Sequence, residues 1–217
     1  MQLATNPYQQ IYVGGLSNER YRELTRRHEG RIFWSPGSLE MRSIREGHFD
    51  KGLLKNFLQK IFVASMNFNE ATEIGSYLGL RSQSAENLAR AFVEDMGMYV
   101  CCITDGVNPT YFNSLSCGAG KSPGRQDFTV LREQASGIFL DQDRAQDGFN
   151  TNGAGDTFAG ALAALLEDGM PLDESVAIAD RLAQLKLCCG QSHLGLADHD
   201  ELAAYISDQT CLVGGMI

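Results

Sequence analysis

A glycine-rich turn followed directly by a long apolar run constrains this chain more than any other stretch. The turn at residues 153–157 reads Gly-Ala-Gly-Asp-Thr, and the run from Phe158 to Leu166 is rich in alanine and leucine without a polar stripe. This composition predicts a buried helix whose N-terminus lies at the turn. The first N–H groups of a helix have no intrahelical partner and carry the positive end of its dipole. The turn can therefore hold a phosphate, or the charge that develops on one during transfer.

Asp156 adds a fixed carboxylate beside this anion site. Such a group is suited to taking a proton from an attacking hydroxyl. The alternative interpretation is a tight turn with an N-capping aspartate, and the residues alone leave both open. Two better-known glycine patterns are excluded: the dinucleotide fingerprint needs glycine at the position of Phe158, and the Walker pattern needs a lysine after these glycines.

A second polar group follows an apolar strand signal at residues 61–64. Asn67 and Glu70 stand three residues apart, where open α/β sheets place their ligands, at the carboxyl end of a strand. The same spacing is typical of a capping box, in which Asn67 caps a helix and Glu70 bonds back to it. The spacing alone does not decide between the two interpretations.

Strand and helix signals alternate along the chain. Runs typical of strands occur at residues 10–13, 31–34, 61–64, 99–103 and 137–140. Stretches typical of helices occur at residues 18–29, 51–60, 84–96, 157–166 and from 172 towards 190. This order predicts an α/β fold with a mostly parallel sheet covered by helices, in which the 157–166 helix is nearly fully buried. The polar, glycine-rich stretch 114–136 is expected to form a mobile loop.

The stretch Asn150 to Ala161, read as Asn-Thr-Asn-Gly-Ala-Gly-Asp-Thr-Phe-Ala-Gly-Ala, resembles the C-terminal signature of the ribokinase-like (PfkB) family of sugar and nucleoside kinases. The resemblance implies a three-layer α/β sandwich and ATP-dependent phosphorylation of a sugar or nucleoside hydroxyl. It also implies that Asp156 is the catalytic base. Gly153, Ala154 and Gly155 would then form the anion hole for the transferred phosphoryl group.

The resemblance extends to the remaining site residues. Asn67 and Glu70 are similar to the family's Asn-x-x-Glu motif, which organises Mg²⁺ and its water shell. The nucleotide would be bound by a Thr-x-Gly pair, by the signature and by an adenine-pocket helix, here at Thr104, Gly106, Asn152 and Ala179. Some members carry a monovalent-cation site beside the turn, which implies Asn150 and Thr151; the family usually has Asp where this chain has Asn150.

The amino-acid composition limits the size of the domain, the kinds of partner and the cellular compartment that we expect. At 217 residues and 43% hydrophobic, the chain is expected to form a single ribokinase-like domain over 1–217, with no lid domain. The net charge of −9 argues against nucleic acid or an anionic membrane as a partner. The six cysteines show no Cys-x-x-Cys spacing, which favours free thiols in a reducing compartment. With no signal peptide and no apolar run of membrane-spanning length, we expect a cytoplasmic protein.

The resemblance matches only the central and C-terminal parts of the family. Its first third, with sugar contacts and a small β-lid, has no counterpart here. This leaves an alternative function, that of a truncated, catalytically weak nucleotide-binding partner or scaffold. Missing first strands also predict an open sheet edge near residues 11–13 or 31–34, and hence a homo-oligomer, because exposed edges tend to pair.

Overall fold

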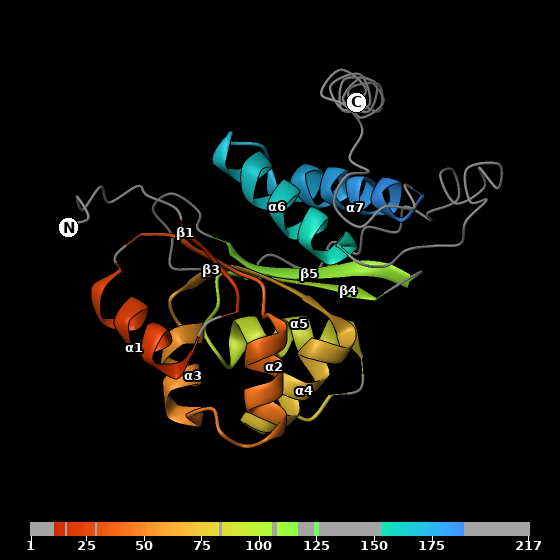
Figure 1. Ribbon diagram of the computed structural model, residues 1–217. Coiled ribbons are helices and arrows are strands. Elements are labelled where there is room, and N and C mark those ends of the chain that lie inside the picture. The colour runs from red at the N-terminus through yellow and green to blue at the C-terminus, as the bar shows by residue number, and fades with distance from the viewer. Residues whose placement is uncertain are drawn as a thin grey trace, which may run out of the picture. The chain divides into compact units, whose positions relative to one another are not determined.

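The computed structural model describes residues 11–15, 17–28, 30–82, 84–105, 108–116, 124–125 and 153–188 (Figure 1). It divides into two compact units, residues 1–132 and 133–217. The predicted strand at 137–140 and most of the expected loop at 114–136 lie outside the described residues. The described parts of that stretch, 114–116 and 124–125, belong to strands and not to a loop. The expectation of one domain over 1–217 stays a prediction. No helix among the described residues is long and apolar enough to cross a membrane.

The first unit is built on an open, mostly parallel sheet. Its strands are β1 (Ile11–Val13), β2 (Ile32–Trp34), β3 (Ile61–Asn67), β4 (Val100–Asp105), β5 (Asn108–Ser116) and β6 (Gly124–Arg125). They lie side by side in chain order. β1 to β4 are parallel, whereas β5 runs antiparallel to β4 and β6 antiparallel to β5. The predicted α/β fold is therefore confirmed.

Five helices of this unit lie on one face of the sheet (Figure 1). They are α1 (Asn18–Arg27), α2 (Ser38–Arg45), α3 (Lys51–Leu58), α4 (Phe68–Leu78) and α5 (Ala85–Glu94). Predictions at 18–29, 51–60 and 84–96 are confirmed within three residues at each end. The sequence pattern did not predict α2. This helix is only about two helical turns long and follows the turn Ser35-Pro36-Gly37, so its apolar periodicity is too short to recognise.

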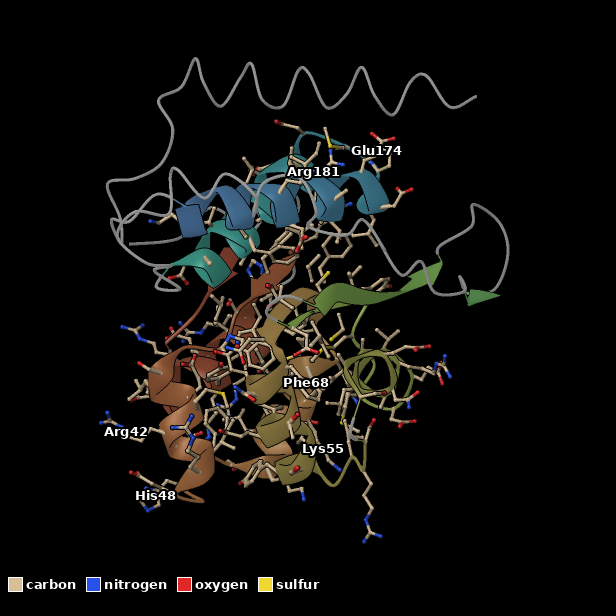
Figure 2. All side chains as sticks on the ribbon, turned by 90° about the vertical axis from the view of Figure 1, so that its right-hand side faces the viewer. Arg42, His48, Lys55, Phe68, Glu174 and Arg181 are labelled. Atoms are coloured by element: carbon tan, nitrogen blue, oxygen red, sulfur yellow. The ribbon has the colours of Figure 1, made fainter. Side chains whose placement is uncertain are left out.

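The core of the first unit lies between the helices and the sheet. Sheet residues Trp34, Met66 and Ile103 belong to one buried cluster with the helices. Arg42 on α2 and Lys55 on α3 are exposed and point away from it (Figure 2). Phe33 and Cys102, each next to a cluster residue along its strand, are outside the cluster and still buried. Burial on both faces explains why these strands read as continuous apolar runs.

β1 is one of the two edge strands of the described sheet, and β6 is the other. β1 pairs only with β2, while β2 lies between β1 and β3. Of the two expected edge positions, residues 11–13 are confirmed, whereas 31–34 form an inner strand. The expected homo-oligomer stays a prediction.

The second unit contains two helices packed against each other, α6 (Ala154–Glu167) and α7 (Leu172–Cys188) (Figure 1). α6 begins at the predicted turn and ends at Glu167, with Asp168 as its C-cap and Gly169, at φ of 85°, directly after it. The expected burial of this helix nearly all round is wrong. Phe158 and Leu162 are buried, but Gly160 is exposed. Small residues without polar groups read as apolar in a sequence, although alanine and glycine also occur on exposed helix faces.

The adjacent thiols of Cys101 and Cys102 on β4 are fully buried and free, as the spacing of the cysteines predicted. Burial raises the pKa of Cys102 to about 12. At pH 8 only ~10⁻⁴ of such a thiol is ionised, and the thiolate is the reactive form. We predict that iodoacetamide leaves the peptide carrying both cysteines unmodified in the native protein and alkylates it after unfolding, as mapped by mass spectrometry. Native-state alkylation at the rate of a free peptide would contradict the burial of this strand.

Candidate active site

The N-terminus of α4 fixes two of the predicted metal ligands. Asn67 ends β3 and is the N-cap of α4, which starts at Phe68 (Figure 2). The backbone N–H of Glu70 donates to Asn67 Oδ1 over 2.9 Å, and the N–H of Asn67 donates to Glu70 Oε2 over 2.9 Å. The capping-box interpretation is therefore confirmed. It does not decide the metal role, because the same bonds orient both side chains at the carboxyl end of β3.

Thr104 lies next to this capping box. It stands opposite Asn67 in the parallel register of β3 and β4, so their backbones are about 4.8 Å apart. Thr104 is half-buried, one residue before the end of β4. The structure thus brings the predicted nucleotide residue Thr104 next to the predicted metal residues Asn67 and Glu70, although it follows them by more than thirty positions in the chain. They lie at the edge of the sheet where open α/β folds bind ligands.

The N-terminus of α6 is not capped by a side chain. Its N-cap is Gly153, in the left-handed conformation with φ of 83°, and no side-chain hydrogen bond closes the helix end. By contrast, the N-caps of α3, α4 and α5 each accept a first-turn N–H. The Thr157 N–H and hydroxyl both donate to the Gly153 carbonyl, over 2.9 and 2.8 Å. Among the described residues, no hydrogen bond is recorded for the N–H groups of residues 154–156, which suits them to binding an anion.

Asp156 is the third residue of α6 and is exposed. It is not the N-cap, so the alternative interpretation of an N-capping aspartate is wrong. A glycine at the cap is required here because a φ of 83° is strained for any residue with a Cβ. The turn thus presents backbone N–H groups and an exposed carboxylate without a competing cap.

The remaining predicted site residues are only partly described. Ala179 on α7 is fully buried, and its expected contact with adenine stays a prediction. Gly106, Asn150, Thr151 and Asn152 lie outside the described residues. Asn67, Glu70 and Thr104 belong to the first unit, whereas Gly153 to Asp156 and Ala179 belong to the second.

The described residues contain no group of three or more His, Cys, Asp or Glu side chains that could hold a metal ion. A magnesium site in a phosphotransferase does not need such a group, because Mg²⁺ keeps several waters and binds one or two carboxylates together with substrate phosphates. One carboxylate with an amide oxygen, as at Glu70 and Asn67, is compatible with that chemistry.

An open parallel sheet with polar residues at its carboxyl edge, and an uncapped glycine turn before a helix, are each features with which α/β proteins bind phosphate. The model of the pfkB family carbohydrate kinases matches residues 41–198. The chain belongs to this family, as its resemblance to the signature implied. No curated protein sequence matches the chain significantly.

Solved structures of ribokinase-like enzymes share the fold. The Thermotoga maritima ribokinase is 14% identical over 92% of this chain and 57% of its own, with a TM-score of 0.64. The nucleoside kinase of Burkholderia thailandensis, solved with inosine, is 18% identical over 95% of this chain and 57% of its own, with a TM-score of 0.66. The Schistosoma mansoni adenosine kinase, solved with adenosine and AMP, is 18% identical over 86% of this chain and 52% of its own, with a TM-score of 0.61. The chain spans about half the length of these structures.

Proposed function

We propose that this protein is an ATP-dependent phosphotransferase that phosphorylates a hydroxyl of a sugar or a nucleoside. Membership in the pfkB family supports a sugar or nucleoside kinase in general terms. The observation that carries the proposal for this chain is the N-terminus of α6, which lacks a side-chain cap and bears the exposed Asp156 in its first turn.

In this proposal the α6 turn acts on both the acceptor hydroxyl and the transferred phosphoryl group. Asp156 accepts the proton of the acceptor hydroxyl while that oxygen forms a bond to the γ-phosphorus and the bond to the leaving ADP oxygen breaks. The backbone N–H groups around Gly153, Ala154 and Gly155 stabilise the charge on the transferred phosphoryl oxygens. Both effects are preorganised, because the left-handed Gly153 fixes the turn before any ligand binds.

The nucleotide and metal would be held by residues at the carboxyl edge of the sheet and by the signature. Thr104 and Gly106 hold nucleotide phosphates, and the signature and α7 contribute Asn152 and Ala179. Glu70 and Asn67 hold Mg²⁺, which neutralises charge on the phosphate oxygens when bound. A monovalent cation, if the enzyme uses one, is held at Asn150 and Thr151.

Two functions are compatible with the family, and one experiment separates them. The second candidate is a nucleotide-binding partner or scaffold with little catalytic activity, because the chain spans about half the length of the kinases it resembles. The test measures ADP formation from MgATP with D-ribose, D-fructose, adenosine and inosine as acceptors, and MgATP binding by calorimetry. Acceptor-dependent ADP formation supports the kinase. Binding of MgATP without transfer to any acceptor supports the scaffold.

Glu70 is assigned two roles, one in the capping box and one as a Mg²⁺ ligand, and substitutions can separate them. Glu70→Gln keeps an oxygen that can accept the Asn67 N–H, so the capping box and the melting temperature should be retained. The negative charge that would attract Mg²⁺ is lost, so the Mg²⁺ concentration giving half-maximal rate should rise on the order of tenfold.

The matched variant Glu70→Ala removes both functions. It should cost about 1 kcal/mol in the free energy of unfolding through loss of the cap, in addition to the change in Mg²⁺ dependence. Titration of the rate with Mg²⁺ and thermal melting of both variants measure the two effects. A Glu70→Gln enzyme with the wild-type Mg²⁺ dependence would show that Glu70 acts only as a cap.

A further inference from the structure

A buried carboxylate, which the sequence analysis did not single out, joins three elements of the first unit. Glu40 on α2 is 1% exposed, although a buried charge is costly unless it is hydrogen-bonded. Its Oε1 accepts the hydroxyl of Tyr21 on α1 over 3.0 Å. The indole N–H of Trp34, the last residue of β2, donates to the same Tyr21 oxygen over 2.8 Å. Burial, and secondarily Glu40, raises the pKa of Tyr21, which keeps the phenol protonated as a donor.

The other oxygen of Glu40 holds the loop after β2. The backbone N–H of Gly37 donates to Glu40 Oε2 over 3.1 Å. Since Oε1 is bonded to Tyr21, the carboxylate fixes Gly37 relative to α1 and to the end of β2. Removing the carboxylate would therefore release the loop at one defined backbone position.

The loop after β2 is in turn packed against the loop after β1, backbone to backbone. A Cβ added at Gly37 would lie 2.7 Å from the Gly15 nitrogen, and one added at Gly14 would lie 2.9 Å from the Ser35 oxygen. Both distances are shorter than any that real Cβ atoms adopt. The two loops therefore cannot shift independently, and the bond from Glu40 to Gly37 constrains both.

These loops lie at the same edge of the sheet as the proposed magnesium and nucleotide residues. β1, β2, β3 and β4 are parallel neighbours, so residues 14–15 and 35–37 follow the carboxyl ends of strands next to β3, which ends at Asn67. Thr104, on β4, lies on the opposite side of Asn67 from these loops. The loops thus lie on the part of this edge that the proposed nucleotide residue Thr104 does not occupy.

We propose that Glu40 is a positioning residue, which holds the paired loops after β1 and β2 in the shape against which the acceptor binds. The inference rests on the proposed kinase function, since it assigns the acceptor side of that same site. Glu40 touches neither reactant. It acts through the Gly37 N–H and through the contact of Gly37 with Gly15.

The test compares variants that break different bonds of the network. Glu40→Leu removes the acceptor of both Gly37 and Tyr21. Tyr21→Phe removes the bond to Tyr21 and leaves the bond to Gly37, and Glu40→Gln retains an oxygen for the Gly37 N–H. Gly37→Ala retains the Glu40 carboxylate, although the added Cβ would lie 3.0 Å from Glu40 Oε2, and it forces the two loops apart. This variant keeps the test available if Glu40→Leu does not fold.

Two measurements are made on each variant well below its melting temperature. The first is KM and kcat for the acceptor that the wild type uses among D-ribose, D-fructose, adenosine and inosine, with KM for MgATP. The second is amide hydrogen exchange of residues 14, 15, 35 and 37, since Pro36 has no amide hydrogen. We expect Glu40→Leu and Gly37→Ala to raise the acceptor KM on the order of tenfold or more, with little change in the KM for MgATP, and to speed exchange in both loops. Tyr21→Phe and Glu40→Gln should keep the wild-type acceptor KM although both lower the melting temperature.

A purely structural role gives a different result. If Tyr21→Phe changes the acceptor KM and the loop exchange as much as Glu40→Leu does, the positioning role is overturned. If the wild-type protein transfers phosphate to no acceptor, the proposed function fails separately, and exchange alone then decides. Unchanged exchange at both loops in Glu40→Leu and Gly37→Ala overturns the inference in that case.

Discussion

Asp156→Asn is expected to lower the turnover number by roughly 10²- to 10⁴-fold, the range over which general bases contribute to catalysis. The change removes the proton acceptor and keeps the size of the side chain. Because Asp156 is exposed and is not the cap of α6, the free energy of unfolding should change by no more than about 1 kcal/mol, the usual worth of a charge in the first turn of a helix. The affinity for MgATP should change little, because the glycine turn remains.

A matched control lies at the other end of the same helix. Asp168 is the exposed C-cap of α6, so Asp168→Asn removes the same charge from the same helix away from the turn. It should leave the turnover number unchanged and stabilise the helix slightly, since a negative charge is unfavourable near a C-terminus. Steady-state kinetics, calorimetric MgATP binding and thermal melting on both variants give the comparison. If the turnover number of Asp156→Asn is within twofold of the wild-type value, Asp156 is not the catalytic base.

Gly155→Ala is expected to lower the turnover number on the order of 10²-fold without weakening the fold. Gly155 is an exposed residue of the first turn of α6, and a Cβ added there meets no described atom within 4 Å. If the turn binds the phosphoryl group as proposed, the added methyl group would hinder a phosphoryl oxygen from reaching the backbone N–H groups, and losing one such contact costs about 10²- to 10³-fold. Alanine is the better helix former, so the free energy of unfolding should stay equal or rise by up to about 1 kcal/mol.

Gly160→Ala is the control for this change. Gly160 lies in the same helix, is exposed and likewise has open space around an added Cβ among the described residues. Both alanine variants should therefore have melting temperatures at or above that of the wild type, and only Gly155→Ala should lose activity. Equal loss of activity in the two variants would point to an effect on the helix as a whole. Full activity in Gly155→Ala would show that the turn does not bind the transferred phosphoryl group.

The sequence by itself determined the elements whose signals are local. Buried parallel strands read as apolar runs, which is why β1 to β4 were found, although β3 continues three residues beyond the predicted end at 64. The capping box at Asn67 and Glu70 was visible from their spacing, because it depends on four consecutive residues. The start of α6 was visible because its turn places glycine where φ must be positive.

Only the tertiary structure decided what depends on residues far apart in the chain. β5 forms because β4 offers an antiparallel partner, and its sequence carries no comparable strand signal of its own. Strand register set Asn67 opposite Thr104. Glu40 looks like an ordinary acidic residue in the first turn of a helix, and only the approach of Tyr21 and Gly37 makes its carboxylate a buried acceptor. Burial and hydrogen bonding belong to neighbours brought together by folding, so spacing along the chain does not encode them.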